Sequence, residues 1–196
     1  MKWVKENWPK STFFLVIYTT ILLWLFVMRQ NFPLFLIWIQ MSVYFLHQFE
    51  EYIFPGGFLV FFNRNMLGSS NDKFPLDENG YFWINIPIIF IAFPVSAILA
   101  NQYNLSIGMW VVYFSVINAF SHVVMFLKFK CKYNPGLAVS VFVNIPVGIY
   151  TIYYFISNQI VTKSAHLIGF LIALVVQGAM MFWGFRILRP KIKRVQ

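Results

Sequence analysis

The sequence predicts an all-α, polytopic membrane protein with six transmembrane helices and both termini in the cytoplasm. Three observations predict this class. The chain of 196 residues is 60% hydrophobic and only 11% charged, which is unlike a soluble domain. Its apolar residues fall into six runs of about 20 residues, each long enough to cross the hydrocarbon core as a helix. Most of its lysines and arginines lie on one side of the resulting topology.

The six expected spans cover residues 11–28, 33–54, 82–100, 105–129, 136–157 and 165–188. Together they form a single transmembrane domain over residues 1–196. The one long connection, the cytoplasmic loop 55–81, contains the apolar run Phe58–Phe62. This run is too short to cross a membrane, so it is expected to lie in the interface or to fold back as a lid over the cytoplasmic helix ends.

Proline and asparagine mark helix starts and irregularities. Pro33 suits the first turn of the second span, and Asn134-Pro135 predicts an N-cap followed by proline at the start of the fifth. Pro87, Pro94 and Pro146 fall inside spans. Because proline lacks a backbone N–H and clashes with the preceding turn, these three positions predict kinks.

The basic residues follow the positive-inside rule. Of fifteen lysines and arginines, only Arg29 and Lys163 lie on the side opposite to the termini. This distribution places both termini in the cytoplasm and requires an even number of spans. The net charge of +9 does not indicate a nucleic-acid partner, because no basic helix face or aromatic-basic patch accompanies it. The expected partner is membrane lipid, and the expected location is a cell membrane.

The motif His47-x-x-Glu50-Glu51 lies in the second span. Placing an ionisable group in lipid costs about 2.5–3.5 kcal/mol on insertion scales, so each one needs a physical reason. Residues three and four apart share a helix face, so His47 lies beside both glutamates, which diverge by roughly 100° around the axis. A second intramembrane histidine, His122, lies at a matching depth in the fourth span.

Three asparagines accompany these groups at a similar depth. Asn118 is one turn from His122, Asn144 lies in the fifth span, and Asn85 lies in the first turn of the third. Polar groups from four helices thus gather in the cytoplasmic half of the membrane, which predicts one polar cavity open to the cytoplasm. The alternatives are that the glutamates end a shorter second span, that His122 is a packed histidine, and that the asparagines only join helices.

Two chemistries suit these candidate catalytic and metal-binding residues. In the first, His47, His122 and one or both of Glu50 and Glu51 bind a divalent metal, zinc or iron, with an open position for a ligand. A glutamate left free would then act as general base. In the second, no metal is bound, and a desolvated glutamate, Glu50 or Glu51, exchanges a proton with the help of His47.

The string HQFEE at residues 47–51 of a small polytopic chain resembles the HXXEE family of bacterial membrane proteins, which is named for this motif. The setting adds specificity: the second span, a Pro-Gly-rich loop after it, and a downstream Asn-x-x-x-His at residues 118–122. The resemblance implies a six-helix architecture over most of the chain, a bacterial plasma membrane location and an important role for the histidine and both glutamates of the motif. The family has no established activity, so no substrate is implied.

Three classes of function are compatible with the sequence. The first is an intramembrane enzyme acting on a lipid or isoprenoid-like substrate that enters sideways from the bilayer, by analogy of site chemistry with membrane sterol isomerases and terpene cyclases. The second is a small proton- or cation-coupled transporter that uses Glu50 and Glu51. A polar path into the outer half would favour it, and the sequence offers Gln40, Ser42 and Ser115 there. The third is a partner subunit with a structural polar cluster.

Overall fold

The computed structural model describes residues 1–130 and 133–192, and within these ranges it contains helices, turns and loops but no strand. Six helical spans are long and apolar enough to cross a membrane: Lys2–Phe26, Phe32–Tyr52, Glu78–Gln102, Leu105–Phe129, Leu137–Ser157 and Lys163–Ile192. The predicted all-α class and the six spans are therefore confirmed. The largest difference is at the first span, which begins at Lys2 rather than at residue 11.

Most spans are built from consecutive helical segments. In chain order these are α1 (Lys2–Phe26), α2 (Phe32–Tyr52), α3 (Phe58–Phe61), η1 (Phe62–Leu67), α4 (Glu78–Asn85), η2 (Ile86–Ala92), α5 (Phe93–Gln102), η3 (Leu105–Gly108), α6 (Met109–Phe129), α7 (Leu137–Val139), η4 (Ser140–Asn144), α8 (Ile145–Ser157), α9 (Lys163–Phe182), η5 (Trp183–Leu188) and α10 (Arg189–Ile192). Segment η3 is a 3₁₀-helix, and the other η segments are π-helical.

Prolines coincide with the changes of helical pattern. Pro33 lies in the first turn of α2, as expected, and the Asn31 side chain caps that helix by accepting from Leu34 N. Pro87, Pro94 and Pro146 each lie in the first turn of a segment, namely η2, α5 and α8. A proline cannot continue the ordinary hydrogen-bond ladder, and wider π-helical turns relieve its clash with the preceding carbonyl.

The first span extends to Lys2 because its polar start packs against the protein. Trp8 is buried, and its ring lies against the rings of Tyr52, Tyr81 and Phe90. These aromatic contacts join α1 to α2 and to the α4–α5 span. A stretch with the composition of a tail is therefore held as helix by tertiary packing.

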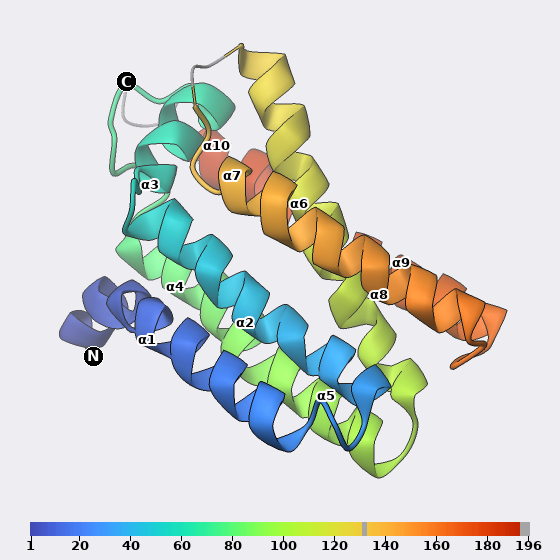
Figure 1. Ribbon diagram of the computed structural model, residues 1–196. Coiled ribbons are helices and arrows are strands. Elements are labelled where there is room, and N and C mark those ends of the chain that lie inside the picture. Colours follow the sequence, from blue (N-terminus) through green and yellow to red (C-terminus); the bar gives the residue numbers. More distant parts are fainter. Residues whose placement is uncertain (131–132, 193–196) are drawn as a thin grey trace.

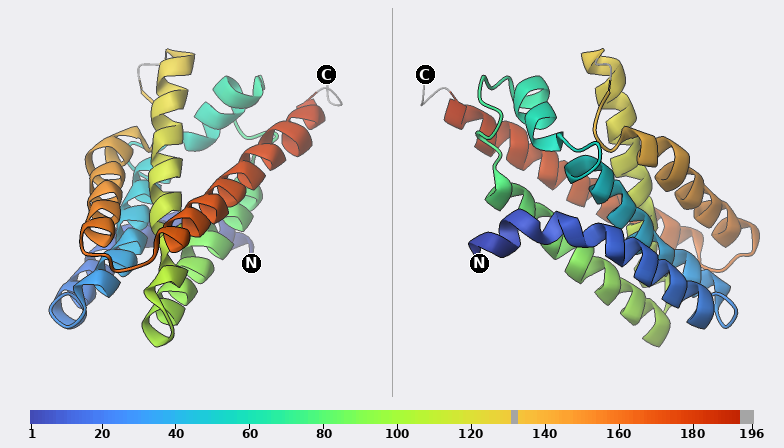
Figure 2. Two further views of the ribbon diagram at one scale, coloured as in Figure 1. Left: turned by 90° about the vertical axis from the view of Figure 1, so that its right-hand side faces the viewer. Right: turned by 60° about the vertical axis from the view of Figure 1, so that its left-hand side comes forward.

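The spans form two groups (Figure 1). Helices α1 and α2 and the α4–α5 span run side by side, and α6, α8 and α9 form the second group, with contacts between α2 and α6 joining the two. The start of α1, the segments α3 and η1, and α10 all lie at one end of the bundle, which we call the terminal end (Figures 1 and 2). An even number of spans requires the first and last described segments, α1 and α10, to lie at the same end. The charge distribution predicts that this end is cytoplasmic.

The connection between the second and third spans folds over the terminal end of the bundle. Its helical segments α3 and η1 contain the apolar run predicted to lie in the interface or to act as a lid. Phe58 packs against the rings of Tyr52 and His122. The buried side chain of Asn63 holds the rest of the connection, since it donates to the carbonyl of Leu76 at 2.8 Å and accepts from its amide at 2.9 Å. The connection thus covers the buried end of α2.

Candidate metal centre

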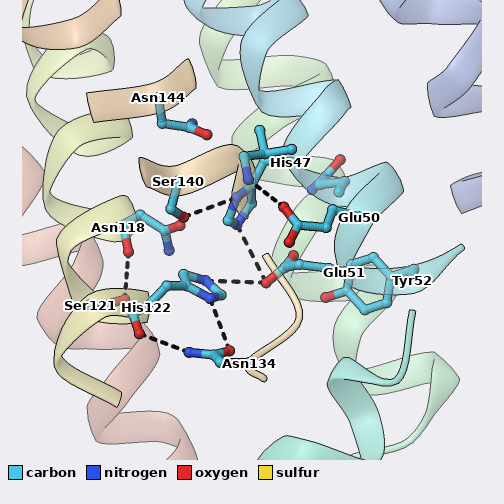
Figure 3. Close-up of polar contacts among 12 residues, drawn as sticks. His47, Glu50, Glu51, Tyr52, Asn118, Ser121, His122, Asn134, Ser140 and Asn144 are labelled. Atoms are coloured by element: carbon cyan, nitrogen blue, oxygen red, sulfur yellow. Dashed lines mark hydrogen bonds and ion pairs between the residues drawn. The ribbon is translucent and has the colours of Figure 1, made fainter. Parts of the chain in front are cut away.

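His47, Glu51 and His122 meet in the interior of the bundle (Figure 3). Nε2 of His47 lies 3.5 Å and Nε2 of His122 lies 3.3 Å from the same oxygen, Glu51 Oε1. The two imidazole centroids are 4.7 Å apart, and the rings are nearly perpendicular. All three side chains are buried. Imidazoles from two separate helices, α2 and α6, therefore meet with a carboxylate of α2 in one place.

These separations fit two ligands of one ion better than they fit hydrogen bonds. A charge-assisted N–H···O bond has a donor–acceptor distance of about 2.7–2.9 Å. Two ligand atoms about 2.1 Å from a tetrahedral ion lie about 3.4 Å apart. In addition, His47 Nε2 is buried and has no hydrogen-bond partner in the described part of the chain. The three side chains could therefore hold a divalent metal ion.

The second nitrogen of each imidazole is held by a neighbour. His122 Nδ1 lies 3.3 Å from Asn134 Oδ1, and Asn134 Nδ2 donates to the carbonyl of His122 at 2.8 Å. Because Oδ1 can only accept, His122 Nδ1 is the donor in this contact, so Nε2 of the neutral imidazole would be the nitrogen that binds an ion. His47 Nδ1 lies 3.4 Å from Ser140 Oγ. Metal-binding histidines are commonly oriented by such partners.

The predicted N-cap role of Asn134 was wrong. Its side chain is turned to His122, and the backbone amides at the start of α7 are bound elsewhere. Ala138 N and Val139 N donate to the carboxylate of Glu50 at 2.9 and 2.6 Å. A buried carboxylate from another helix is a stronger acceptor for these amides than an asparagine. The sequence gives no sign of this contact, because 88 residues separate Glu50 from Ala138.

Glu50 is adjacent to Glu51 but points to a different set of partners. Besides the two amides, its carboxylate accepts from the hydroxyl of Tyr133. Burial and the Glu50 carboxylate raise the pKa of Tyr133, so its hydroxyl stays protonated and remains a donor at neutral pH. Glu50 does not belong to the group of side chains that could share an ion. The structure therefore does not bring Glu50, one of the predicted ligands, to the two histidines.

Glu50→Gln is expected to lower the stability of the protein by about 1–3 kcal/mol, because three donors lose a charged acceptor in a buried place. Thermal unfolding of the purified protein in detergent measures this loss. Glu78→Gln is the control, since Glu78 is partly exposed and pairs with Lys73 at 3.4 Å; we expect it to change stability by less than about 0.5 kcal/mol. Unchanged stability of Glu50→Gln would contradict the capping role.

Gly136 is a site residue that was not expected from the sequence. Its φ is +95°, and a Cβ built on it would lie 2.8 Å from Cε1 of both His47 and His122 and 3.0 Å from Cγ of Glu51. The turn after α6 can therefore lie directly against all three side chains only because residue 136 has none of its own. The string Asn134-Pro135-Gly136 signals a turn in the sequence, but not what the turn touches.

The three predicted cavity asparagines have different roles. Asn85 is fully engaged between helices: its Oδ1 accepts from Gln48 Nε2 at 2.8 Å, and its Nδ2 lies 3.0 Å from the Tyr52 hydroxyl and 2.9 Å from the Tyr81 carbonyl. This side chain joins α4 to α2. The alternative of interhelical hydrogen bonding therefore describes Asn85 well.

Asn118 and Asn144 each keep a free acceptor. Asn118 Nδ2 donates to Gln177 Oε1 at 3.3 Å, and Asn144 Nδ2 donates to Ser115 Oγ at 3.1 Å. The Oδ1 atom of each asparagine is buried and has no partner within residues 1–130 and 133–192. A buried amide oxygen without a partner is costly, so these two atoms are candidates to bind water or a ligand.

A pocket of about 60 Å³ lies beside the centre. Its polar lining consists of Glu51, Asn85, Asn118, Ser121, His122 and Gln177, and most of the remaining lining consists of aromatic and methionine side chains. The cavity predicted as polar is therefore lined by polar groups from several helices but mainly by aromatic and apolar side chains. An apolar pocket with a few convergent polar groups is typical of a site for a largely apolar ligand.

The fold and the site define an all-helical protein that has six helices long and apolar enough to cross a membrane and a buried group of two histidines and one carboxylate. The chain belongs to the HXXEE family: the model of this family, described as proteins of unknown function with HXXEE motif, matches residues 38–151, which is more than half of the chain. The matched segment contains the three side chains of the centre and Gly136. No curated protein and no solved structure matches the chain.

Proposed function

We propose that this protein is an intramembrane enzyme that acts on a lipid or isoprenoid-like substrate at a divalent metal held by His47, Glu51 and His122. The observation that carries the proposal is the convergence of two Nε2 atoms on one buried carboxylate oxygen at 3.3 and 3.5 Å. Two histidines and one carboxylate are a ligand set of catalytic zinc and of non-haem iron. Such a set leaves coordination positions open.

The pocket beside the centre supports a lipidic substrate. A divalent ion held there would polarise a substrate oxygen as a Lewis acid. The aromatic and methionine side chains of the pocket would exclude water and contact the apolar part of the substrate. The free Oδ1 of Asn118 would accept from a substrate donor and so orient it. In a metal-free version, Glu51 and the two histidines would exchange a proton with the substrate.

The test is lipid conversion by the purified protein. The protein would be reconstituted in vesicles of a total lipid extract, and the lipids would be compared by mass spectrometry with and without a chelator. We expect a lipid product that is lost in His47→Ala with His122→Ala and on chelation. His166→Ala is the matched control, because His166 pairs with the Tyr113 hydroxyl at 2.9 Å outside the centre. An unchanged lipid profile with metal-loaded protein would contradict an enzyme.

Transport of a proton or cation is a second candidate, because buried polar pairs continue beyond the centre. Asn144 pairs with Ser115 at 3.1 Å, and Gln40 pairs with Thr151 at 3.2 Å. All four side chains are buried. Gln40 is seven residues from His47 on α2, two turns away on the same face. For transport, these pairs would have to act as successive parts of a polar column between α2, α6 and α8.

A flux assay separates transport from catalysis. Vesicles containing the protein and a pH-sensitive dye would report proton entry after a pH jump. A transporter would show flux that is lost in Gln40→Leu, whereas an enzyme would convert lipid in that variant and show no flux. Ser42, a further polar residue of α2, pairs instead with Thr19 of α1 at 2.6 Å and lies outside the column.

A further inference from the structure

Helices α6 and α9 touch at one end of their shared interface and separate at the other. Near the start of α9, a Cβ on Gly169 would lie 2.9 Å from Met109 Cβ and 3.0 Å from Trp110 N, so the two helices are in close contact there. The Asn118–Gln177 hydrogen bond joins them further along. Toward the terminal end the two helices diverge (Figure 2), and a groove of about 600 Å³ lies between them.

This groove shares a wall with the pocket of the metal centre. Ser121, Met125, Gln177 and Met181 line both. Apart from Lys128, the rest of its α6 wall is apolar, and Val124 on this wall is 59% exposed. In a bilayer such a surface faces acyl chains, so a lipid chain lying in the groove would have a lateral route to the centre.

Two cations stand at the terminal end of the groove, one on each wall. Lys128 lies in the last turn of α6, and Arg189 begins α10. Both are exposed, and neither forms an ion pair with a carboxylate in the two described ranges. Lys128 is six residues beyond His122, so it lies about 9 Å further along the helix axis. A phosphate between these residues would meet positive charge from both sides.

We propose that the groove binds a lipid that carries a phosphate. The phosphate lies between Lys128 and Arg189, and a hydrocarbon chain follows the apolar wall formed by Ile117, Phe120 and Val124. The segment of the lipid about 9 Å below the phosphate then lies level with His122. This inference rests on the proposed function and names its substrate class. Apolar surface alone would accept any lipid, whereas two cations that have no carboxylate partner among the described residues would select an anionic one.

Native mass spectrometry in detergent tests the charge requirement. The probes are dioleoyl phosphatidic acid, and dioleoylglycerol, which has the same chains without the phosphate. Lys128→Gln with Arg189→Gln is compared with Lys10→Gln with Lys191→Gln, which removes the same charge from exposed residues outside the groove. We expect about 10- to 30-fold weaker binding of phosphatidic acid by the first double variant only, because each cation near a headgroup contributes several-fold in affinity.

Further measurements distinguish effects on lipid binding in the groove from effects on metal binding at the centre. Val124→Trp narrows the groove without changing charge and should weaken binding of both lipids. Metal content should stay at the wild-type level in all groove variants, and His122→Ala should still bind phosphatidic acid. Equal affinities of the two double variants, or equal affinities of wild type for the two lipids, would overturn the proposal. Displacement of the lipid by millimolar inorganic phosphate would also overturn it. If the wild-type protein bound phosphatidic acid selectively but converted no lipid, the proposed enzymatic function would be refuted and the lipid-binding groove would not.

Discussion

Glu51→Gln is expected to leave the purified protein without bound divalent metal. The Glu51 carboxylate is the group that both histidines face, and the amide of glutamine is neutral and places a donor or a weak acceptor there. Loss of an outer partner of a metal ligand already costs about 10- to 100-fold in affinity, so loss of this ligand should cost more than about 100-fold. Elemental analysis after dialysis and chelator competition for zinc or iron measure the effect.

The matched control is Glu50→Gln, the same change one residue away. Glu50 is bound by Tyr133, Ala138 and Val139, so this variant should keep its metal while losing stability. Equal metal loss in both variants would show that the two carboxylates act together and would contradict the ligand set proposed here. A folded wild-type protein that takes up no metal from supplemented buffer would favour the metal-free version. Loss of folding in Glu51→Gln alone would favour a structural polar cluster.

Gly136→Ala is expected to disrupt the centre although it changes no polar group. The added methyl would lie 2.8 Å from Cε1 of each imidazole, so at least one ring must move. A left-handed backbone costs a non-glycine residue about 1–2 kcal/mol, and overpacking of a buried site costs about 1–3 kcal/mol. We expect a lower unfolding temperature together with a large loss of metal affinity, measured by thermal unfolding and by chelator competition.

Gly178→Ala is the control for this variant. Gly178 lies in α9, and a Cβ there would meet no atom within 4 Å among the described residues. Alanine in a helix interior is favoured over glycine by about 0.5–1 kcal/mol, so stability should stay equal or rise. If Gly136→Ala retained wild-type metal affinity and stability, the close packing of the turn against the imidazoles would be wrong.

The positions and lengths of the spans were predictable from the sequence wherever the need to place apolar residues in lipid sets them. The fourth span was expected at residues 105–129 and is found at Leu105–Phe129, because its length is set by an uninterrupted apolar run. The start of the first span was not predictable, since residues 2–10 are polar enough for a tail and become helical through the packing of Trp8. The helical segments α3 and η1 were not predictable either, because helices this short depend on tertiary contacts for their stability.

The candidate site was predictable in part. His47 and His122 stood out because an ionisable group in a membrane span is costly and needs a partner. Their spacing along two helices gave the same depth, and the structure confirms that they meet. Spacing could not decide between Glu50 and Glu51, which point in different directions from one helix. That decision depends on the turn at residues 133–139, which surrounds Glu50 with donors.

By itself, the sequence determined that this chain is a six-span helical protein whose costly polar groups gather at one depth. The length of a hydrophobic run and the free-energy cost of placing a charged side chain in lipid depend on residues that are close together in the sequence. Both can therefore be predicted from the sequence alone. Only the tertiary structure decided which carboxylate faces the histidines, that a glycine turn packs against them, and that a groove with two cations leads to their pocket. These features depend on distances between residues far apart in the chain, which no local pattern contains.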